Sequence, residues 1–203
     1  MKRRVGLLAL CMSLAGCGSG PPLPTYQSAF TNLYNAGDPA SVPADAAVRV
    51  EHPVAIILSD NVEAYIDWLR RSDEAMHKVI PAALINTVGE ADADPNYIAA
   101  HFLDMLKQHF PEAQVVKDFN AAVGSSKKAV LLLDIQAVVS GTSGGKTTVD
   151  ATLYVFDAQM NPVSKMSGHG EGTVPFPATT AMVQPSTDAA VRQLDAKVAA
   201  LAH

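Results

Sequence analysis

The sequence predicts an α+β domain with a mixed, largely antiparallel sheet, a C-terminal three-strand meander and helices packed mainly on one face of the sheet. Three strand patterns follow one another at residues 128–140, 147–157 and 163–174, and short loops join them. Helical patterns precede and follow these strands. In the middle strand, apolar residues alternate with polar ones from Thr148 to Val155, which is typical of a sheet with one covered and one wetter face.

The N-terminus has the pattern of an export signal. Three cations at residues 2–4 precede an apolar run at residues 5–14, which is too short to span a bilayer as a finished helix. The run ends in Leu14-Ala15-Gly16-Cys17, which resembles the lipobox of bacterial lipoproteins. This resemblance implies that residues 1–16 are a signal peptide. It also implies that Cys17 is lipidated and becomes the first residue after cleavage.

We expect residues 17–46 to form the lipidated cysteine and a flexible tether. Residues 18–24 (GSGPPLP) are small and proline-rich, and residues 36–46 contain two prolines and two aspartates. Between them, Tyr26–Tyr34 carries aromatic residues at helical spacing and can dock on the domain as an amphipathic turn. Residues 47–203 are expected to form a single periplasmic domain.

The first strand candidate of this domain is residues 47–58, which Pro53 interrupts. A helix follows, with Asp60 as its N-cap. Its apolar stripe comprises Val62, Tyr65, Ile66 and Leu69. We expect this helix to fray at the charged run 70–74, and we expect a strand at residues 78–88.

A second helix is predicted over residues 94–110, with Asp94 as its N-cap and Pro95 at the first helical position. It ends before Pro111 and should bury one face on the sheet. A short strand at residues 113–117 follows it and leads to the meander.

Gly168, Gly170 and Gly172 fall on one face of the last strand. Either closely approaching backbone covers that face or the strand bends there. After a loop with several prolines, Ser186 can cap a last helix. Its buried stripe comprises Val191, Leu194, Val198 and Leu201.

The charge of the chain excludes some partners. The predicted leader holds three of the 15 Lys and Arg residues, which leaves 12 against 20 Asp and Glu, a formal charge of 12 − 20 = −8. An acidic surface repels nucleic acid and anionic headgroups, so attachment to a membrane would come from the lipid on Cys17. Cys11 lies in the leader, so no free thiol remains for a disulfide, a nucleophile or a metal site.

Residues 140–147 (SGTSGGKT) are similar to a phosphate-binding P-loop, but Ser140 stands where the motif requires its first glycine. A P-loop also needs a helix after it, whereas an alternating strand follows Thr147. The segment is therefore predicted to be a hairpin turn.

His169 and Glu171 lie at positions i and i+2 on one side of the last strand. This geometry can serve a metal ion or a general base, and it also fits two solvated side chains near a sheet edge, the interpretation that we favour. His101, Asp104 and His109 on the second predicted helix are a weaker candidate, because the two histidines are eight residues apart.

Asp134 is the one carboxylate within an apolar strand, and we expect a structural role for it. The aromatic residues Tyr26, Phe30, Tyr34 and Trp68 can form a partner-binding patch or simply pack in the core. We predict no catalytic residue, no cofactor and no metal site, and therefore a protein that is not an enzyme.

The order of elements behind the lipobox resembles the α/β domain of a group of envelope proteins. The group includes the curli-secretion lipoprotein, the lipoprotein activators of penicillin-binding proteins and the N-terminal domain of TolB. The resemblance covers residues 47–201, through YIAAHFLDMLKQHFPEAQVV, KAVLLLDIQAVV, the meander and STDAAVRQLDAKVAAL. It implies a non-catalytic adaptor or accessory subunit that binds an envelope protein. The alternative is a periplasmic carrier of a lipid or small ligand, auxiliary to an ABC-type transport system.

The same resemblance implies a location. Gly18 follows the cysteine where an aspartate would indicate the inner membrane, so the expected site is the outer membrane, with the domain facing the periplasm.

Overall fold

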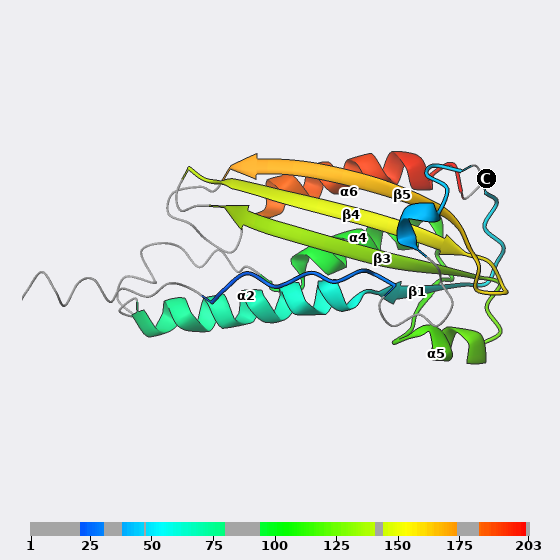
Figure 1. The fold of residues 1–203 in the computed structure, drawn as a ribbon, viewed down its shortest axis with the longest axis horizontal. Coiled ribbons are helices and arrows are strands. Elements are labelled where there is room, and N and C mark those ends of the chain that lie inside the picture. Colours follow the sequence, from blue (N-terminus) through cyan, green and yellow to red (C-terminus); the bar gives the residue numbers. More distant parts are fainter. Residues whose placement is uncertain are drawn as a thin grey trace, which may run out of the picture.

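The sheet of this protein has five strands in the order β2-β1-β3-β4-β5 (Figure 1). Its strands are β1 (Val54–Leu58), β2 (Gln114–Val115), β3 (Ala129–Ser140), β4 (Lys146–Phe156) and β5 (Pro162–Thr173). The computed structural model describes residues 21–30, 38–46, 48–79, 94–140, 144–173 and 183–201. β1 pairs in parallel with β2 and β3, whereas β3–β4 and β4–β5 are antiparallel. The predicted mixed sheet and its C-terminal meander are confirmed.

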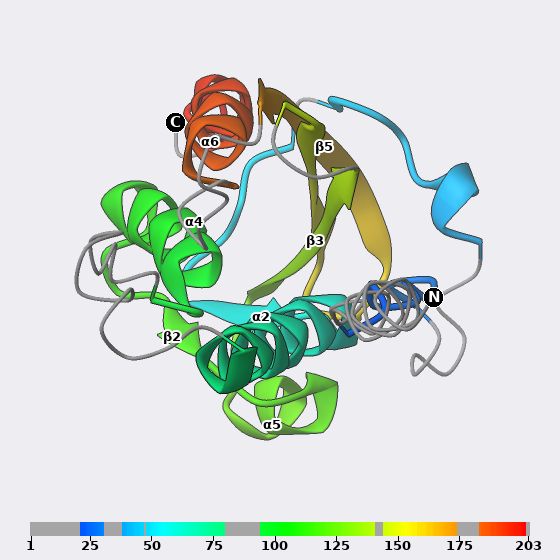
Figure 2. The same cartoon turned by 90° about the vertical axis from the view of Figure 1, so that its left-hand side faces the viewer.

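In the described residues, the sheet is accompanied by a short 3-10 turn, η1, and by helices α2, α4, α5 and α6. Their bounds are η1 (Pro39–Ser41), α2 (Asp60–Val79), α4 (Tyr97–His109), α5 (Phe119–Gly124) and α6 (Gln184–Val198). Figure 2 shows α4 and α6 side by side on one face of the sheet. Buried residues of α2 belong to the core on this same face, while α5 packs on the other. Helices therefore cover mainly one face, as predicted.

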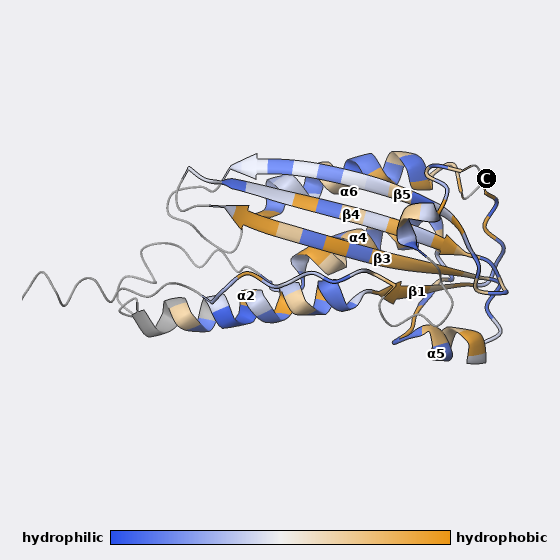
Figure 3. Cartoon of the chain, viewed as in Figure 1, coloured by the Kyte–Doolittle hydropathy of each residue, from blue (hydrophilic) through white to orange (hydrophobic). Residues whose placement is uncertain are grey.

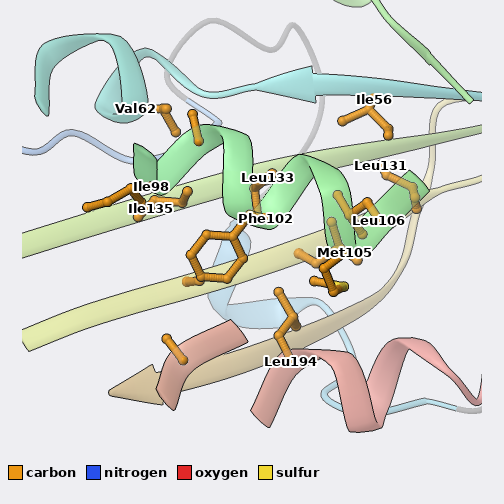
Figure 4. Packing of buried hydrophobic residues seen from close by; sticks show 14 of the residues in the cluster. Ile56, Val62, Ile98, Phe102, Met105, Leu106, Leu131, Leu133, Ile135 and Leu194 are labelled. Carbon is orange, nitrogen blue, oxygen red and sulfur yellow. The ribbon is translucent and has the colours of Figure 1, made fainter. Parts of the chain in front are cut away.

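The main core lies between β3 and the helices α4 and α6. Phe102 and Leu106 of α4 and Leu194 of α6 are buried against Leu131 and Leu133 of β3 (Figure 4). Leu194 belongs to the buried stripe that the helical periodicity predicts for the last helix. Side chains fill the layer between the sheet and these helices.

The second face of the sheet is covered over only part of its length. Val130 and Leu132 of β3 pack there with Phe30, Val42 and Ala122. Figure 3 shows the hydrophobic colour along β1 and the start of β3, and more hydrophilic colours along β5. The exposed part of this face is therefore formed by the C-terminal halves of β3 and β5 and by the N-terminal half of β4.

The glycines of β5 lie under α6, as one of the two predicted alternatives requires. A Cβ on Gly170 would lie 1.8 Å from the carbonyl oxygen of Ser186, and one on Gly168 would lie 2.3 Å from that of Ala190. No side chain fits between the two backbones, so glycine allows the helix to pack directly on the strand.

Several predicted boundaries are wrong. β1 comprises only Val54–Leu58, without the half of the candidate strand before Pro53. α2 does not fray at residues 70–74 but continues to Val79, because Arg70, Arg71 and Glu74 are exposed while Trp68 and Leu69 are buried. The strand expected at residues 78–88 therefore begins within a helix. Residues 80–93 lie outside the described residues.

The predicted helix caps are also corrected. Asp60 is the first residue of α2 rather than its cap, and Asp94 accepts a hydrogen bond from the backbone N–H of Asn96 before α4 begins at Tyr97. Ser186 lies inside α6 and donates its hydroxyl to the carbonyl oxygen of Val183. Asp94 and Ser186 each bond a neighbouring backbone group near the helix start, so the sequence pattern is right about the region, and the three predicted caps are off by one to three residues.

The short helix α5 has no counterpart among the predicted elements. Asp118 caps it by accepting a hydrogen bond from the N–H of Ala121 at 2.8 Å. Six residues are too few for a visible 3.6-residue apolar period, which is the pattern on which helix prediction depends.

Two segments of the expected tether belong to the folded body. Phe30 and Val42 are buried, and the backbone of residues 43–45 hydrogen bonds to Lys165 of β5. Residues 21–30 also contact α2 and β3 through hydrogen bonds described below. The expectation of a flexible tether over residues 17–46 is therefore corrected for residues 21–30 and 38–46.

Candidate functional site

The open half of the second sheet face is a polar surface on three adjacent strands. The antiparallel registers place Gln136 opposite Asp150, and Asp150 opposite His169. We call this surface the polar face. Its members are Gln136 and Val138 of β3, Thr148, Asp150 and Thr152 of β4, and Ser167, His169, Glu171 and Thr173 of β5. All of them are exposed or half-buried.

His169 lies between two carboxylates on the polar face. Its Nδ1 is 2.6 Å from Asp150 Oδ1, and its Nε2 is 3.4 Å from Glu171 Oε1. Hydrogen bonds to Asp150, and then to Glu171, raise the pKa of the imidazole above its usual value. The protonated ring can donate to both carboxylates at once.

This arrangement engages both ring nitrogens of His169. Both ring nitrogens face a carboxylate, so neither presents a lone pair to a substrate or a metal ion. The His169 side chain is 49% exposed, and the two carboxylate side chains are each 60% exposed. Within the described residues, no group of His, Cys, Asp and Glu has an arrangement that could hold a metal ion.

A buried polar cluster lies at the β3 edge of the polar face. Asp134 is 5% exposed and accepts hydrogen bonds from Ser59 at 2.5 Å and from the Asn61 amide at 2.7 Å. Asn61 also exchanges two hydrogen bonds of 2.9 Å with the backbone of Gln27. Asp134 therefore has the structural role that we predicted, and its cluster connects β3, α2 and the N-terminal segment.

The N-terminal segment makes two further hydrogen bonds. β3 extends beyond its parallel partner β1, and there Tyr26 Oη donates to the carbonyl oxygen of Ala137 and accepts from its N–H. Burial raises the pKa of Tyr26 to about 12. Trp68 Nε1 donates to the carbonyl oxygen of Pro21 at 3.0 Å. We call residues 21–30, with these contacts, the strap.

Other residues selected from the sequence have structural roles. Ser140 and Lys146 are paired across the β3–β4 hairpin, which confirms a turn instead of a P-loop, although residues 141–143 lie outside the described residues. Phe30 and Trp68 are core residues. Cys17 and Tyr34 also lie outside the described residues, so the lipidation site remains a prediction.

The two histidines of α4 both pair with aspartates of α6. His101 lies 3.3 Å from Asp188, and His109 lies 2.6 Å from Asp195. Asp104 is exposed and apart from them. The histidines therefore connect two helices instead of converging on a metal ion.

Sequence reasoning missed Asp150, Ser59 and Asn61. Asp150 is one of the polar residues in the alternation of β4, but only the strand register puts it opposite His169. Ser59 and Asn61 flank the start of α2 and are 75 and 73 residues from Asp134 in the chain. No local pattern could have connected them.

Comparisons with known proteins do not assign a family. No protein-family model matches the chain, and no curated protein matches it. Among the described residues, no helix combines the length and apolar character that crossing a membrane requires.

Several solved structures share part of the fold. The PelC dodecamer from Paraburkholderia phytofirmans has 12% identity and a TM-score of 0.41, covering 77% of this chain and 91% of that one. The hypothetical protein CT253 from Chlamydia trachomatis has 12% identity and a TM-score of 0.32, covering 52% and 85%. Lipoprotein GNA1162 from Neisseria meningitidis has 15% identity and a TM-score of 0.24, covering 60% and 84%.

Proposed function

We propose that this chain is an outer-membrane lipoprotein, anchored through lipid on Cys17, whose periplasmic domain is a non-catalytic adaptor or accessory subunit of an envelope assembly or transport machine. The observation that carries the proposal is the motif Leu14-Ala15-Gly16-Cys17 behind a short charged and apolar leader. The resemblance to adaptor lipoproteins of the envelope adds the class of function.

The polar face supports a role in binding a protein. It is exposed, it lies on three hydrogen-bonded strands, and its hydroxyl and carboxylate groups can accept hydrogen bonds without moving the backbone. A carboxylate offers about four acceptor positions, and the His169 ring takes only one from each. Asp150 and Glu171 can therefore also pair with Arg or Lys side chains of a partner.

The same geometry supports a non-catalytic role. His169 is held between two carboxylates, and all three side chains are about half or more exposed, so water screens their charges; among the described residues, no wall encloses them. A ligand carrier would need space between the sheet and the helices, and Phe102, Leu106 and Leu194 fill that layer (Figure 4). We therefore propose an adaptor rather than a carrier or an enzyme.

The experiment compares the intact lipoprotein with Cys17→Ala in cross-linked envelopes, by membrane fractionation and affinity capture. We expect Cys17→Ala to leave the membrane fraction and to lose a discrete partner. A protein that stays in the membrane without Cys17 would contradict the anchor. A protein that is released, with no partner in either form, would contradict the adaptor.

A second pair of variants tests the polar face. The double variant Asp150→Lys with Glu171→Lys should stay folded and anchored but lose the partner, since two attractive charges become repulsive. The matched control is Asp104→Lys with Glu112→Lys, two exposed acidic positions away from the polar face. If the control loses the partner as well, net charge matters and the polar face is not the binding surface.

A further inference from the structure

The strap fixes the N-terminal segment to the body of the domain at several separate points. Pro21 bonds to Trp68, Tyr26 bonds to the backbone edge of β3, and Gln27 bonds twice to Asn61. Phe30 is 6% exposed and packs against Tyr154 with the ring centroids 4.7 Å apart and the rings tilted by 60°. The chain is therefore held from Pro21 onward, which leaves little length between the fixed body and Cys17.

The covalent reach from Cys17 to the strap is short. Four residue steps separate Cys17 from Pro21, and at about 3.6 Å per step they span at most about 14 Å. A free tether over residues 17–46 would span 29 steps, or at most about 100 Å. The strap reduces the distance between anchor and domain by roughly sevenfold.

The strap also has a direction. Its contacts run from Asn61 at Gln27 to Trp68 at Pro21, seven residues further along α2, or about 10 Å along the helix axis. Towards its N-terminus, the chain therefore runs in the direction of the C-terminal end of α2, as far as the contact at Trp68. Figure 1 shows that β3 ends on the same side of the molecule, while α5 lies at the opposite end. β3 spans the distance between these two ends of the domain, and its eleven residue steps from Ala129 to Ser140 measure about 36 Å.

We propose that the strap orients the domain on the bilayer, with the end that carries the β3–β4 turn and the C-terminal half of α2 facing the lipid surface and α5 facing away. The inference rests on the proposed lipid anchor at Cys17. Its consequence is that the strands of the polar face run along the bilayer normal, with their Lys146 end near the membrane and the face held at a fixed height. A partner would meet this surface in one orientation.

The test places one fluorophore at each end of the domain. The predicted mature chain has no free thiol, so Lys146→Cys, next to the turn, and Val123→Cys, on α5, each give a single labelling site, and both positions are exposed. The labelled lipoproteins are reconstituted in phosphatidylcholine vesicles that carry a quencher on the lipid headgroups. A matched variant carries 20 Gly and Ser residues between Gly20 and Pro21, which adds a coil of about 25 Å.

We expect the label at position 146 to be quenched and the label at position 123 to keep its fluorescence, and the inserted linker to reduce this difference. Equal quenching of both labels in the protein without the linker, with Cys17→Ala still released from vesicles, would overturn the orientation and leave the anchor intact. If Cys17→Ala stays on the vesicles, the proposed anchor fails and the orientation fails with it.

Discussion

Replacing Gly170 by alanine should destabilise the domain more than any other single methyl addition among the described glycines. The new Cβ would lie 1.8 Å from the Ser186 carbonyl oxygen, whereas an ordinary contact begins at 3.4 Å, so β5 and α6 must separate by about 3.4 − 1.8 = 1.6 Å. The nearest atoms, from Ser186 and Ala190, all belong to the backbone, so no side chain can rotate away to make room. Overpacking of this kind costs about 3 kcal/mol, which for a domain of this size lowers Tm by roughly 6–12 °C.

The matched series makes the reasoning testable by urea and thermal unfolding. Gly168→Ala needs about 3.4 − 2.3 = 1.1 Å of separation, and Gly172→Ala meets first a side-chain hydroxyl, that of Thr147, at 2.7 Å. Gly124→Ala on α5 meets nothing within 4 Å and is the control. We expect the loss of stability to fall in the order Gly170, Gly168, Gly172, Gly124. A Gly170→Ala protein as stable as the Gly124→Ala control would refute the close contact of α6 with β5.

Three further substitutions have expected outcomes. Tyr65→Phe should leave the free energy of unfolding unchanged or raise it by about 1 kcal/mol, because the buried Tyr65 hydroxyl has no hydrogen-bond partner among the described residues. Urea unfolding measures this change. A decrease of more than about 1 kcal/mol would mean that the hydroxyl does make a hydrogen bond. Tyr26→Phe should cost about 1–3 kcal/mol, since the N–H and carbonyl of Ala137 lose their shared partner, and limited proteolysis should then cut the strap faster. His169→Gln should cost stability only at low pH. The pKa of His169 is raised in the fold, chiefly by Asp150, so its contribution is fully present below about pH 6.5 and is lost as pH rises through the folded pKa. Equal effects of His169→Gln on both sides of that range would contradict the pairing.

Much of the fold could be predicted because its signals are local. The three meander strands alternate or run apolar over eleven or twelve residues, and their predicted ends lie within one residue of the observed ones. The parity of Gly168, Gly170 and Gly172 predicted either a face under close backbone or a bend, and the structure has the first. Local patterns could not provide the length of α2. Its charged run at residues 70–74 resembles a helix end, but Arg70, Arg71 and Glu74 are exposed on an amphipathic helix that continues to Val79.

Only part of the candidate site could be predicted from the sequence. His169 and Glu171 were found because two residues on one strand are neighbours in any sheet. Their partner Asp150 was not found, since a strand register depends on turn geometry and on which face the core selects.

The sequence by itself determined the three meander strands, the apolar stripes of the helices and the motif at Cys17, because each depends on residues a few positions apart. Only the tertiary structure decided that residues 21–30 are a strap. Proline-rich composition indicates a spacer. Beyond the end of β1, however, Ala137 is paired with β4 on one side only, and Tyr26 bonds its backbone N–H and carbonyl on the other side. An unpaired buried backbone group is costly, so the segment that satisfies it becomes part of the fold.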